Sequence, residues 1–346
     1  MKTFNLGEIL VGASDRVVVI PEIGINHEGS LDVAKKMVFS AHKAGARIIK
    51  HQTHVCEDEM CDIARKVIPG NSDDSIYEIM ERCALNEEEE LELKKYTEEL
   101  GMFFLSTPFS RAAADRLEKF GVGGYKIGSG ELNNYPLLEH VASFGKPMIV
   151  STGMNDIHAI SKAVNIMEKK GVPYALMHTT NLYPTKPEWV RLGAMETMMK
   201  EFRGVPIGLS DHTLNNNACI AAMAMGAAIV ERHYTDYKER TGPDIICSMD
   251  EKELQDLLIA AKEVPLMRGG EKKAIPEEQV TMDFAFASVV AIKDINMGQT
   301  LNKNNIWVKR PGTGEIKAEK YNELIGKKVK RFIKEGNQLS WKDICD

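Results

Sequence analysis

The sequence predicts an α/β protein, a (β/α)8 TIM barrel followed by a small β-rich module, and three observations lead to this prediction. Short apolar runs alternate with amphipathic segments through roughly the first 265 residues, as in a series of parallel βα units. Polar residues follow each apolar run directly, at the end of the strand where such barrels carry their sites. After Leu266 the alternation stops, and short apolar runs separated by Asn, Gly and Asp turns replace it.

The barrel is expected to occupy residues 1–266, with eight strands that each precede a helix. We expect the strands at 17–20, 47–50, 102–106, 124–127, 147–150, 174–177, 206–209 and 227–230. We expect the helices at 31–44, 85–100, 112–120, 136–144, 157–170, 190–202, 215–226 and 250–264. A long polar excursion, 54–79, interrupts the second unit. A doubly wound open sheet is the alternative fold, although its usual strand count is nearer five or six.

Residues 267–283 are charged and contain two glycines, so we expect a linker there. The last 63 residues, 284–346, form the predicted β-rich module. They contain 12 Lys and Arg against 7 Asp and Glu, a net charge of +5, which leaves −11 on the rest of the chain. Such a basic module could dock on an acidic barrel or place positive charge over an anionic substrate; a solvated basic face is the alternative.

Composition excludes several classes of protein. Of the 346 residues 43% are apolar and 27% charged, as in ordinary globular proteins, and the net charge of −6 argues against nucleic acid as the main partner. The longest apolar run, 218–230, is too short to span a bilayer, and the first ten residues lack a signal pattern. The six cysteines form no CxxC pair, so we expect reduced thiols in a cytoplasmic protein. No GxGxxG follows a strand and no P-loop occurs, so a nicotinamide cofactor is not indicated.

Two histidines follow successive expected strands. Ser210, Asp211 and His212 end the strand at 206–209, and Glu231, Arg232 and His233 end the next one. Parallel neighbouring strands bring both imidazoles to the same edge, where they can hold a divalent metal ion and leave positions open for water or substrate. The alternative is that each histidine only satisfies a local hydrogen bond.

Ten short motifs in the same order along nearly the whole chain resemble the bacterial sialic acid synthases. The motifs lie at 22–27 (Glu-Ile-Gly-Ile-Asn-His), 50–54 (Lys-His-Gln-Thr-His), 106–109 (Ser-Thr-Pro-Phe), 126–131 (Lys-Ile-Gly-Ser-Gly-Glu), 133–136 (Asn-Asn-Tyr-Pro), 151–154 (Ser-Thr-Gly-Met), 208–212 (Gly-Leu-Ser-Asp-His), 231–233 (Glu-Arg-His), 242–244 (Gly-Pro-Asp) and 309–312 (Lys-Arg-Pro-Gly). The resemblance implies a barrel followed by an antifreeze-like (SAF) domain. It also implies condensation of phosphoenolpyruvate with an N-acetylated amino sugar, typically N-acetylmannosamine, to give N-acetylneuraminate and phosphate.

The residue types agree with that chemistry. Phosphoenolpyruvate carries a phosphate and a carboxylate, so its site needs cations and hydrogen-bond donors. The expected set for this substrate is Lys50, Lys126, Thr107, Ser129, Ser151, Asn181 and Ser210. A Schiff-base aldolase also uses a barrel lysine, but the histidine pair favours a metal that polarises the sugar aldehyde without an imine. A non-catalytic sugar-binding barrel would have lost a histidine or lysine, and none is lost.

The resemblance also implies roles for the remaining site residues. His212 and His233 are the expected ligands of Mn2+, with Mg2+ or Co2+ as alternatives. Glu22 and Glu131 are candidates for binding sugar hydroxyls or activating water; we prefer hydroxyl contacts for Glu131 and leave the base open. The expected further sugar contacts are Gln52, Tyr183, Asp244 and Arg310.

The resemblance implies a homodimer in which Arg310 of one subunit reaches the barrel of the other, and phosphate release by C–O cleavage. The sugar stays open, because relatives also use 6-deoxy diacetamido sugars that lead to legionaminic or pseudaminic acid. The Lys-His-Gln-Thr-His and Gly-Ser-Gly-Glu motifs are more similar to those of the N-acetylmannosamine users.

Overall fold

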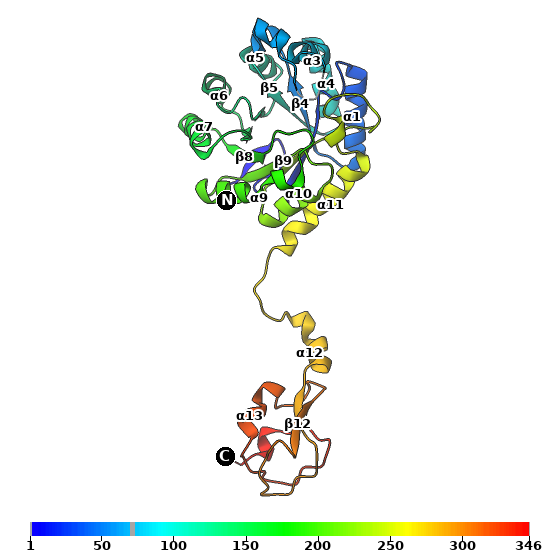
Figure 1. Cartoon of the computed structure of the whole chain (residues 1–346), viewed down its shortest axis with the longest axis vertical. Coiled ribbons are helices and arrows are strands. Elements are labelled where there is room, and N and C mark those ends of the chain that lie inside the picture. Colours follow the sequence, from blue (N-terminus) through cyan, green and yellow to red (C-terminus); the bar gives the residue numbers. More distant parts are fainter. Residues whose placement is uncertain (1, 70–72, 346) are drawn as a thin grey trace. The chain divides into compact units, whose positions relative to one another are not determined.

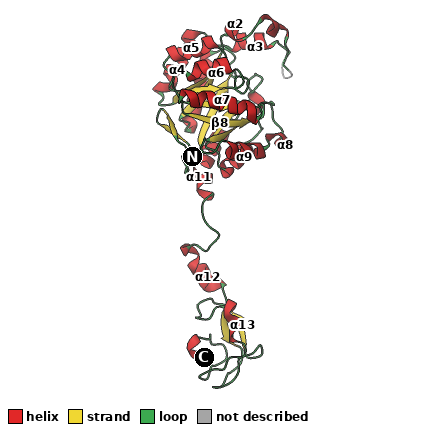
Figure 2. Cartoon of the chain, turned by 90° about the vertical axis from the view of Figure 1, so that its left-hand side faces the viewer, coloured by secondary structure: helices red, strands yellow, loops and turns green. Residues whose placement is uncertain are grey.

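The computed structural model describes residues 2–69 and 73–345, which divide into two compact units, Met1–Gly269 and Gly270–Asp346. The first unit contains a closed barrel of eight parallel strands in the order β10-β3-β4-β5-β6-β7-β8-β9 (Figures 1 and 2). Because β10 pairs with β3, the sheet has no free edge, and the prediction of a (β/α)8 barrel is confirmed against the doubly wound alternative.

The barrel strands follow the predicted order but extend further at their carboxyl ends. They are β3 (Val18–Gly24), β4 (Ile48–Thr53), β5 (Phe103–Pro108), β6 (Tyr125–Ile127), β7 (Met148–Ser151), β8 (Tyr174–Thr179), β9 (Ile207–Asp211) and β10 (Ile229–His233). Residues expected just after several strands, such as Gln52 and His233, therefore belong to the ladder itself. Their backbones are fixed by pairing with neighbouring strands, which gives a site greater precision than loops provide.

Helices surround the barrel (Figure 1). They are α1 (Leu31–Ala44), α4 (Glu87–Glu99), α5 (Arg111–Lys119), α6 (Tyr135–Ala142), α7 (Ile157–Lys170), α9 (Leu192–Glu201), α10 (Asn217–Met225) and α11 (Glu251–Met267). Their ends are set by local chemistry: Asn86 and Asp250 form capping boxes at the starts of α4 and α11, and Gly45 ends α1 in the left-handed conformation.

Three parts of the barrel unit differ from the sequence prediction. An N-terminal hairpin of β1 (Phe4–Leu6) and β2 (Ile9–Val11) packs Leu6 and Val11 against the apolar residues inside the barrel. In its described residues, the polar excursion contains α2 (Cys56–Glu59) and the start of α3 (Ile76–Cys83). The helix expected at 190–202 is α9, which begins at Leu192, and a separate short helix, α8 (Pro187–Val190), precedes it; Arg191 between them adopts φ 52°.

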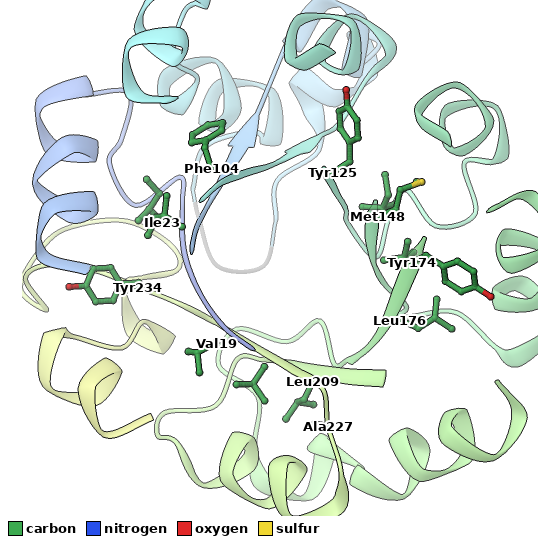
Figure 3. Close-up of a cluster of buried hydrophobic side chains, with 14 of the residues drawn as sticks. Val19, Ile23, Phe104, Tyr125, Met148, Tyr174, Leu176, Leu209, Ala227 and Tyr234 are labelled. Carbon is green, nitrogen blue, oxygen red and sulfur yellow. The ribbon is translucent and has the colours of Figure 1, made fainter. Parts of the chain in front are cut away.

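Side chains alternate between the inside of the barrel and the surrounding helices along every strand. Most labelled side chains in Figure 3, such as Val19, Tyr125, Leu176 and Leu209, belong to barrel strands, point outward from them and form the main hydrophobic core with the helices. The residues between them point inward, and those nearest the amino ends of the strands are apolar, including Val18, Ile20, Ile48 and Ile229. Towards the carboxyl end of each strand, the inward-pointing residues are polar.

The second unit contains an antiparallel pair, β11 (Ser288–Ala291) and β12 (Ile306–Lys309), and several isolated bridges around its own core. It also includes the short helices α12 (Gln279–Ala285) and α13 (Tyr321–Leu324). The predicted linker 267–283 thus contains most of α12.

The six cysteines are free thiols, as expected. In the described parts of the chain, no helix combines the length and the apolar character needed to cross a lipid bilayer.

Candidate active site

The alternation of the strands explains which polar side chains meet at the barrel mouth. Along β10, Ile229 faces the barrel interior, so Glu231 and His233 face it as well. The same rule applies to Ile20 and Glu22 in β3. It assigns to the interior Lys50 and Gln52 of β4, Lys126 of β6, Ser151 of β7 and Ser210 of β9. These inward-facing polar residues form one cluster at the carboxyl ends of the strands.

Two lysines and a glutamate form the buried centre of this cluster. Nζ of Lys126 lies 3.4 Å from Oε1 of Glu231, and Nζ of Lys50 lies 3.6 Å from the same oxygen. Lys50 also forms an ion pair with Glu22. Lys126 donates a hydrogen bond of 2.7 Å to the Ser151 hydroxyl. All five side chains are almost fully buried, so their charges interact at low effective dielectric.

Burial and neighbouring charges shift the pKa values of Lys50 and Glu231 in this cluster. Burial lowers the pKa of Lys50 to about 7, although the carboxylate of Glu231 opposes the shift. Burial also favours the neutral form of Glu231, but the charges of Lys126 and Lys50 outweigh it and hold the pKa of Glu231 at about 2. Oε1 of Glu231 accepts a hydrogen bond of 3.2 Å from Ser210, while its Oε2 has no hydrogen-bond partner among the described residues.

Glu231 was not among the site residues predicted from the sequence. The signal was present, because Glu231 and His233 are two residues apart on one strand and therefore share a face. The expected strand ends at Val230, whereas β10 continues to His233 and brings Glu231 onto its inward face.

The two histidines lie side by side at the mouth. The ring centroids of His212 and His233 are 5.4 Å apart, and the ring of Tyr183 lies 4.1 Å from His212 and 5.9 Å from His233. Nδ1 of His212 is 2.8 Å from the carbonyl oxygen of Thr180, so this nitrogen carries the proton and Nε2 keeps its lone pair. Nδ1 of His233 lies 3.8 Å from the carboxylate of Asp244.

Burial first, and then neighbouring positive charge, lowers the pKa of both His212 and His233 to about 3. Both rings are therefore neutral near pH 7, the state in which imidazole binds metal ions. Burial raises the pKa of Asp244 to about 6, against the opposing influence of His212 and Lys50.

The histidine pair fits a divalent metal ion in its donor set. It offers two neutral imidazoles, and a carbonyl hydrogen bond fixes the tautomer of His212 as second-shell bonds do in metal sites. Among residues 2–69 and 73–345, no group of three or more His, Cys, Asp or Glu side chains is arranged to hold a metal. An ion bound by His212 and His233 would thus keep several positions for water and substrate.

Glu131 lies on the far side of the mouth, in the turn after β6. Its carboxylate packs so closely over Gly128 that a side chain at that position would collide with it. Burial raises the pKa of Glu131 to about 7. The hydroxyl of Ser129 accepts a hydrogen bond of 3.0 Å from the backbone N–H of Gly153, which joins the loops after β6 and β7.

Two other expected substrate contacts have free hydrogen-bonding capacity. Oγ1 of Thr107 and Oδ1 of Asn181 are buried and lack a hydrogen-bond partner among the described residues. Thr107 is paired in register with Gln52, and the Asn181 carboxamide lies against Gly153. Orphaned buried polar atoms are costly, so their presence here is consistent with partners supplied by a ligand.

Two family models match this chain, one over most of the barrel unit and one in the second unit. A model of the NeuB family matches residues 37–273, which is more than half of the chain, and a model of the SAF domain matches residues 286–344. The chain belongs to the NeuB family. The resemblance to sialic acid synthases and the expected antifreeze-like second domain are thereby confirmed.

This NeuB-family chain is similar over nearly its full length to several curated proteins. It is 38% identical to an uncharacterized protein, MJ1065, of Methanocaldococcus jannaschii, with 99% of each chain covered. It is 33% identical to the N,N'-diacetyllegionaminic acid synthase of Legionella pneumophila, with 96% of each covered. Among solved structures, the N-acetylneuraminic acid (sialic acid) synthetase of Leptospira borgpetersenii has a TM-score of 0.74 at 30% identity, covering 81% of this chain and 95% of that chain.

A buried arginine contacts the residues next to the two histidines of the NeuB-family site. Arg232 is 1% exposed, and its Nε lies 3.4 Å from the carboxylate of Asp211, the residue before His212. It also donates hydrogen bonds of 2.6 Å to Asn216 and 2.8 Å to the carbonyl of Thr213. The guanidinium therefore ties together the ends of β9 and β10 that carry the histidines.

Arg310 belongs to the SAF unit. It directly follows β12, its side chain is exposed, and the peptide bond to Pro311 is cis. Its predicted role at the barrel mouth stays a prediction.

Proposed function

We propose that the barrel mouth condenses phosphoenolpyruvate with N-acetylmannosamine to give N-acetylneuraminate and phosphate, with a divalent metal ion, Mn2+ by preference, as cofactor. The observation that carries this proposal is the pair of buried lysines, Lys50 and Lys126, beside two neutral histidines. One half of the site suits a small dianionic or trianionic substrate, and the other half suits a metal-assisted carbonyl.

The lysine half would bind phosphoenolpyruvate. Lys126 and Lys50 supply charge, and hydroxyl or amide groups of Thr107, Ser129, Ser151, Asn181 and Ser210 supply further hydrogen bonds. Without substrate, Glu231 and Glu22 balance the two lysines. An incoming anion would share these cations with Glu231, so the site binds the substrate without burying unpaired positive charge.

The histidine half would bind the open-chain sugar. A metal ion on His212 and His233, with Mg2+ or Co2+ as alternatives to Mn2+, would polarise the sugar aldehyde as a Lewis acid. Tyr183 packs against His212 and Asp244 lies beside His233, so both can contact sugar hydroxyls. Gln52 and Glu22 lie next to Lys50, where the two substrates would meet.

The reaction balances with water as the third reactant. C3 of phosphoenolpyruvate forms a bond to the aldehyde carbon, whose oxygen takes up a proton, and positive charge develops at C2. Water adds at C2 and gives up one proton, which leaves a hydroxyl on C2. As the bond from C2 to the bridging oxygen breaks, this hydroxyl loses its proton and becomes the keto oxygen, and phosphate leaves with the bridging oxygen and takes up that proton. With a pKa of about 7, Glu131 is suited to accept the proton of the water. Glu22, which contacts Lys50 and Gln52, is suited to hold sugar hydroxyls.

We further propose a homodimer in which the SAF unit of one subunit covers the barrel of the other and Arg310 contacts the N-acetyl group. The exposure of Arg310 after β12 supports this role. A cover is expected on physical grounds, because an open mouth would expose a reactive intermediate to bulk water.

The sugar needs a direct test, because the Legionella relative is named a legionaminic acid synthase. Purified protein with phosphoenolpyruvate and Mn2+ is offered N-acetylmannosamine and the 6-deoxy diacetamido sugars that lead to legionaminic and pseudaminic acid, and phosphate release is recorded. We expect the highest kcat/KM with N-acetylmannosamine. A higher value with a diacetamido sugar would reassign the substrate, and covalent trapping of substrate on Lys50 by borohydride would indicate a Schiff-base aldolase instead.

A further inference from the structure

A histidine outside the proposed set of site residues is held at both ring nitrogens. His54 directly follows β4 and is 5% exposed. Its Nδ1 lies 2.8 Å from Oε2 of Glu59 in α2, and its Nε2 lies 3.1 Å from Oε1 of Gln52 in β4. The ring stacks on Phe109 with centroids 4.4 Å apart. These three contacts fix both the position and the rotation of the imidazole.

The contact to Gln52 continues into the barrel mouth. Nε2 of Gln52 donates a hydrogen bond of 3.1 Å to Oε1 of Glu22, and Glu22 forms the ion pair with Lys50. A Cβ at Gly24 would lie 2.7 Å from that Glu22 oxygen and 3.1 Å from that Gln52 nitrogen. The link between Gln52 and Glu22 is therefore packed directly against backbone, and one chain of contacts runs from Glu59 to Lys50.

Donors and acceptors along this chain can be assigned. Glu22 beside the Lys50 ammonium is an ionised carboxylate and only accepts, so Gln52 must present its NH2 group to it. The Gln52 oxygen then faces Nε2 of His54, which must carry a proton to donate. The Glu59 carboxylate likewise requires a proton on Nδ1. The reversed Gln52 amide would set its oxygen against the Glu22 carboxylate, two acceptors without a hydrogen between them.

We propose that His54 is a positioning residue: as an imidazolium held between Glu59 and Gln52, it fixes the Gln52 amide and thereby the direction of the Glu22 carboxylate in the mouth. This rests on the proposed function only in that Glu22 and Gln52 contact the amino sugar. A wrong orientation of Gln52 would weaken sugar binding and leave the lysine half of the site intact.

The groups around His54 are consistent with one positive charge there. Its neighbour in α2 is the Glu59 carboxylate, its neighbour in β4 is the neutral Gln52, and Phe109 after β5 is uncharged. Two further groups interact with the pair electrostatically. Burial, and then His51 and His54, lowers the pKa of His27 to about 3, so His27 adds no competing charge. Burial and the charge of Glu59 raise the pKa of Glu131.

The charge of His54 can be read without any substrate. The full-length protein, labelled with 15N in its nine histidines, is examined by two-bond 1H–15N correlation at pH 7.5, and His54→Gln identifies the His54 signals. We expect both ring nitrogens of His54 to be protonated, and we expect Glu59→Gln to leave one nitrogen bare. A bare ring nitrogen in the unaltered protein would overturn the proposal. So would an unchanged spectrum in Glu59→Gln.

Kinetics then tests positioning. In His54→Ala and in Glu59→Gln we expect the KM for the amino sugar to rise about tenfold, while the KM for phosphoenolpyruvate stays within about twofold. The matched control is His140→Gln, which breaks a similar contact, 2.6 Å to Asp115, on the outer face of the barrel. An equal rise in both KM values, or no change in either, would contradict a positioning role.

The resonance experiment and the kinetic experiment together distinguish a failure of this proposal from a failure of the proposed function. If no sugar gives phosphate release, the proposed function fails, while the resonance experiment still decides the charge of His54. If His54→Ala does not fold, Glu59→Gln keeps the test open, because the amide can still accept the Nδ1 hydrogen bond and removes only the charge.

Discussion

The ammonium group of Lys126 lies 3.4 Å from the Glu231 carboxylate, with both side chains buried at the centre of the barrel mouth. Glu231 also lies 3.6 Å from Lys50, which forms a further ion pair with Glu22, so two carboxylates balance the two lysines until a substrate arrives. This relationship makes Glu231 both a stabilising group and a competitor of the anionic substrate.

Replacing Glu231 with glutamine should therefore destabilise the substrate-free protein. Lys126 loses its carboxylate partner, and breaking a buried ion pair in this way costs roughly 3 kcal/mol. Inorganic phosphate should restore part of that loss, because the anion can occupy the space beside the two lysines. Urea unfolding with and without phosphate measures both effects. Ser210→Ala, which removes only a hydroxyl next to Glu231, is the control. Equal unfolding midpoints for Glu231→Gln and the unaltered protein would contradict this account of the cluster.

Removing the metal should abolish turnover. We expect no phosphate release after exhaustive chelation, recovery with added Mn2+, and a rate at least about a hundredfold lower in His212→Ala or His233→Ala. Mn2+ binding, followed by electron paramagnetic resonance, should weaken in the same variants. His158→Ala, an exposed histidine in α7, should behave like the unaltered protein. Full activity after chelation would remove the metal from the mechanism.

The raised pKa of Glu131 predicts a pH-dependent stability. Because the folded-state pKa is about 7 against 4.5 for the free side chain, this stabilising contribution is fully present below about pH 4.5 and is lost as the pH rises through 7. Between pH 5 and pH 8 the free energy of unfolding should fall more steeply in the unaltered protein than in Glu131→Gln, by on the order of 2 kcal/mol. The variant Glu139→Gln, at an exposed position in α6, controls for general charge effects. Parallel pH profiles for Glu131→Gln and the unaltered protein would show that Glu131 ionises freely.

The role of Arg310 can be tested by mixing subunits. Arg310→Ala and Glu131→Ala should each be nearly inactive alone. In a mixed dimer, the intact barrel of the first variant meets the intact Arg310 of the second, so one of the two sites should work. If Arg310 acts on its own barrel, neither site is whole, and the absence of recovered activity after co-refolding would refute action between subunits.

Much of the fold was predictable because barrel strands and helices have different periods. Runs such as 147–150 are apolar throughout, as strands covered on both faces are, and the helix at 31–44 has clear capping residues at both ends. The ends of the strands were less predictable. The apolar run predicts a strand at 227–230 with Glu231 and His233 at its end, whereas pairing with β3 and β9 keeps both residues within the ladder.

The parts that were missed depend on contacts distant in sequence. The strands β1 and β2 have three residues each, too short for a periodic signal. They are stabilised by packing against the apolar residues inside the barrel. The break at Arg191 is a left-handed backbone conformation that an arginine side chain does not announce. The link from His54 to Glu22 joins neighbouring strands through Gln52, and no spacing in the sequence encodes which way an amide faces.

The measurement that tests the central claim most directly uses phosphoenolpyruvate with 18O in the bridging position. The cluster offers cations and hydroxyls to hold a phosphate, and the account requires water to add at C2 before phosphate departs. We predict that the label appears in the released phosphate when the enzyme turns over with its amino sugar and Mn2+, as mass spectrometry of both products would show. Label retained in the keto acid would mean that the P–O bond breaks, and would contradict the mechanism proposed for this site.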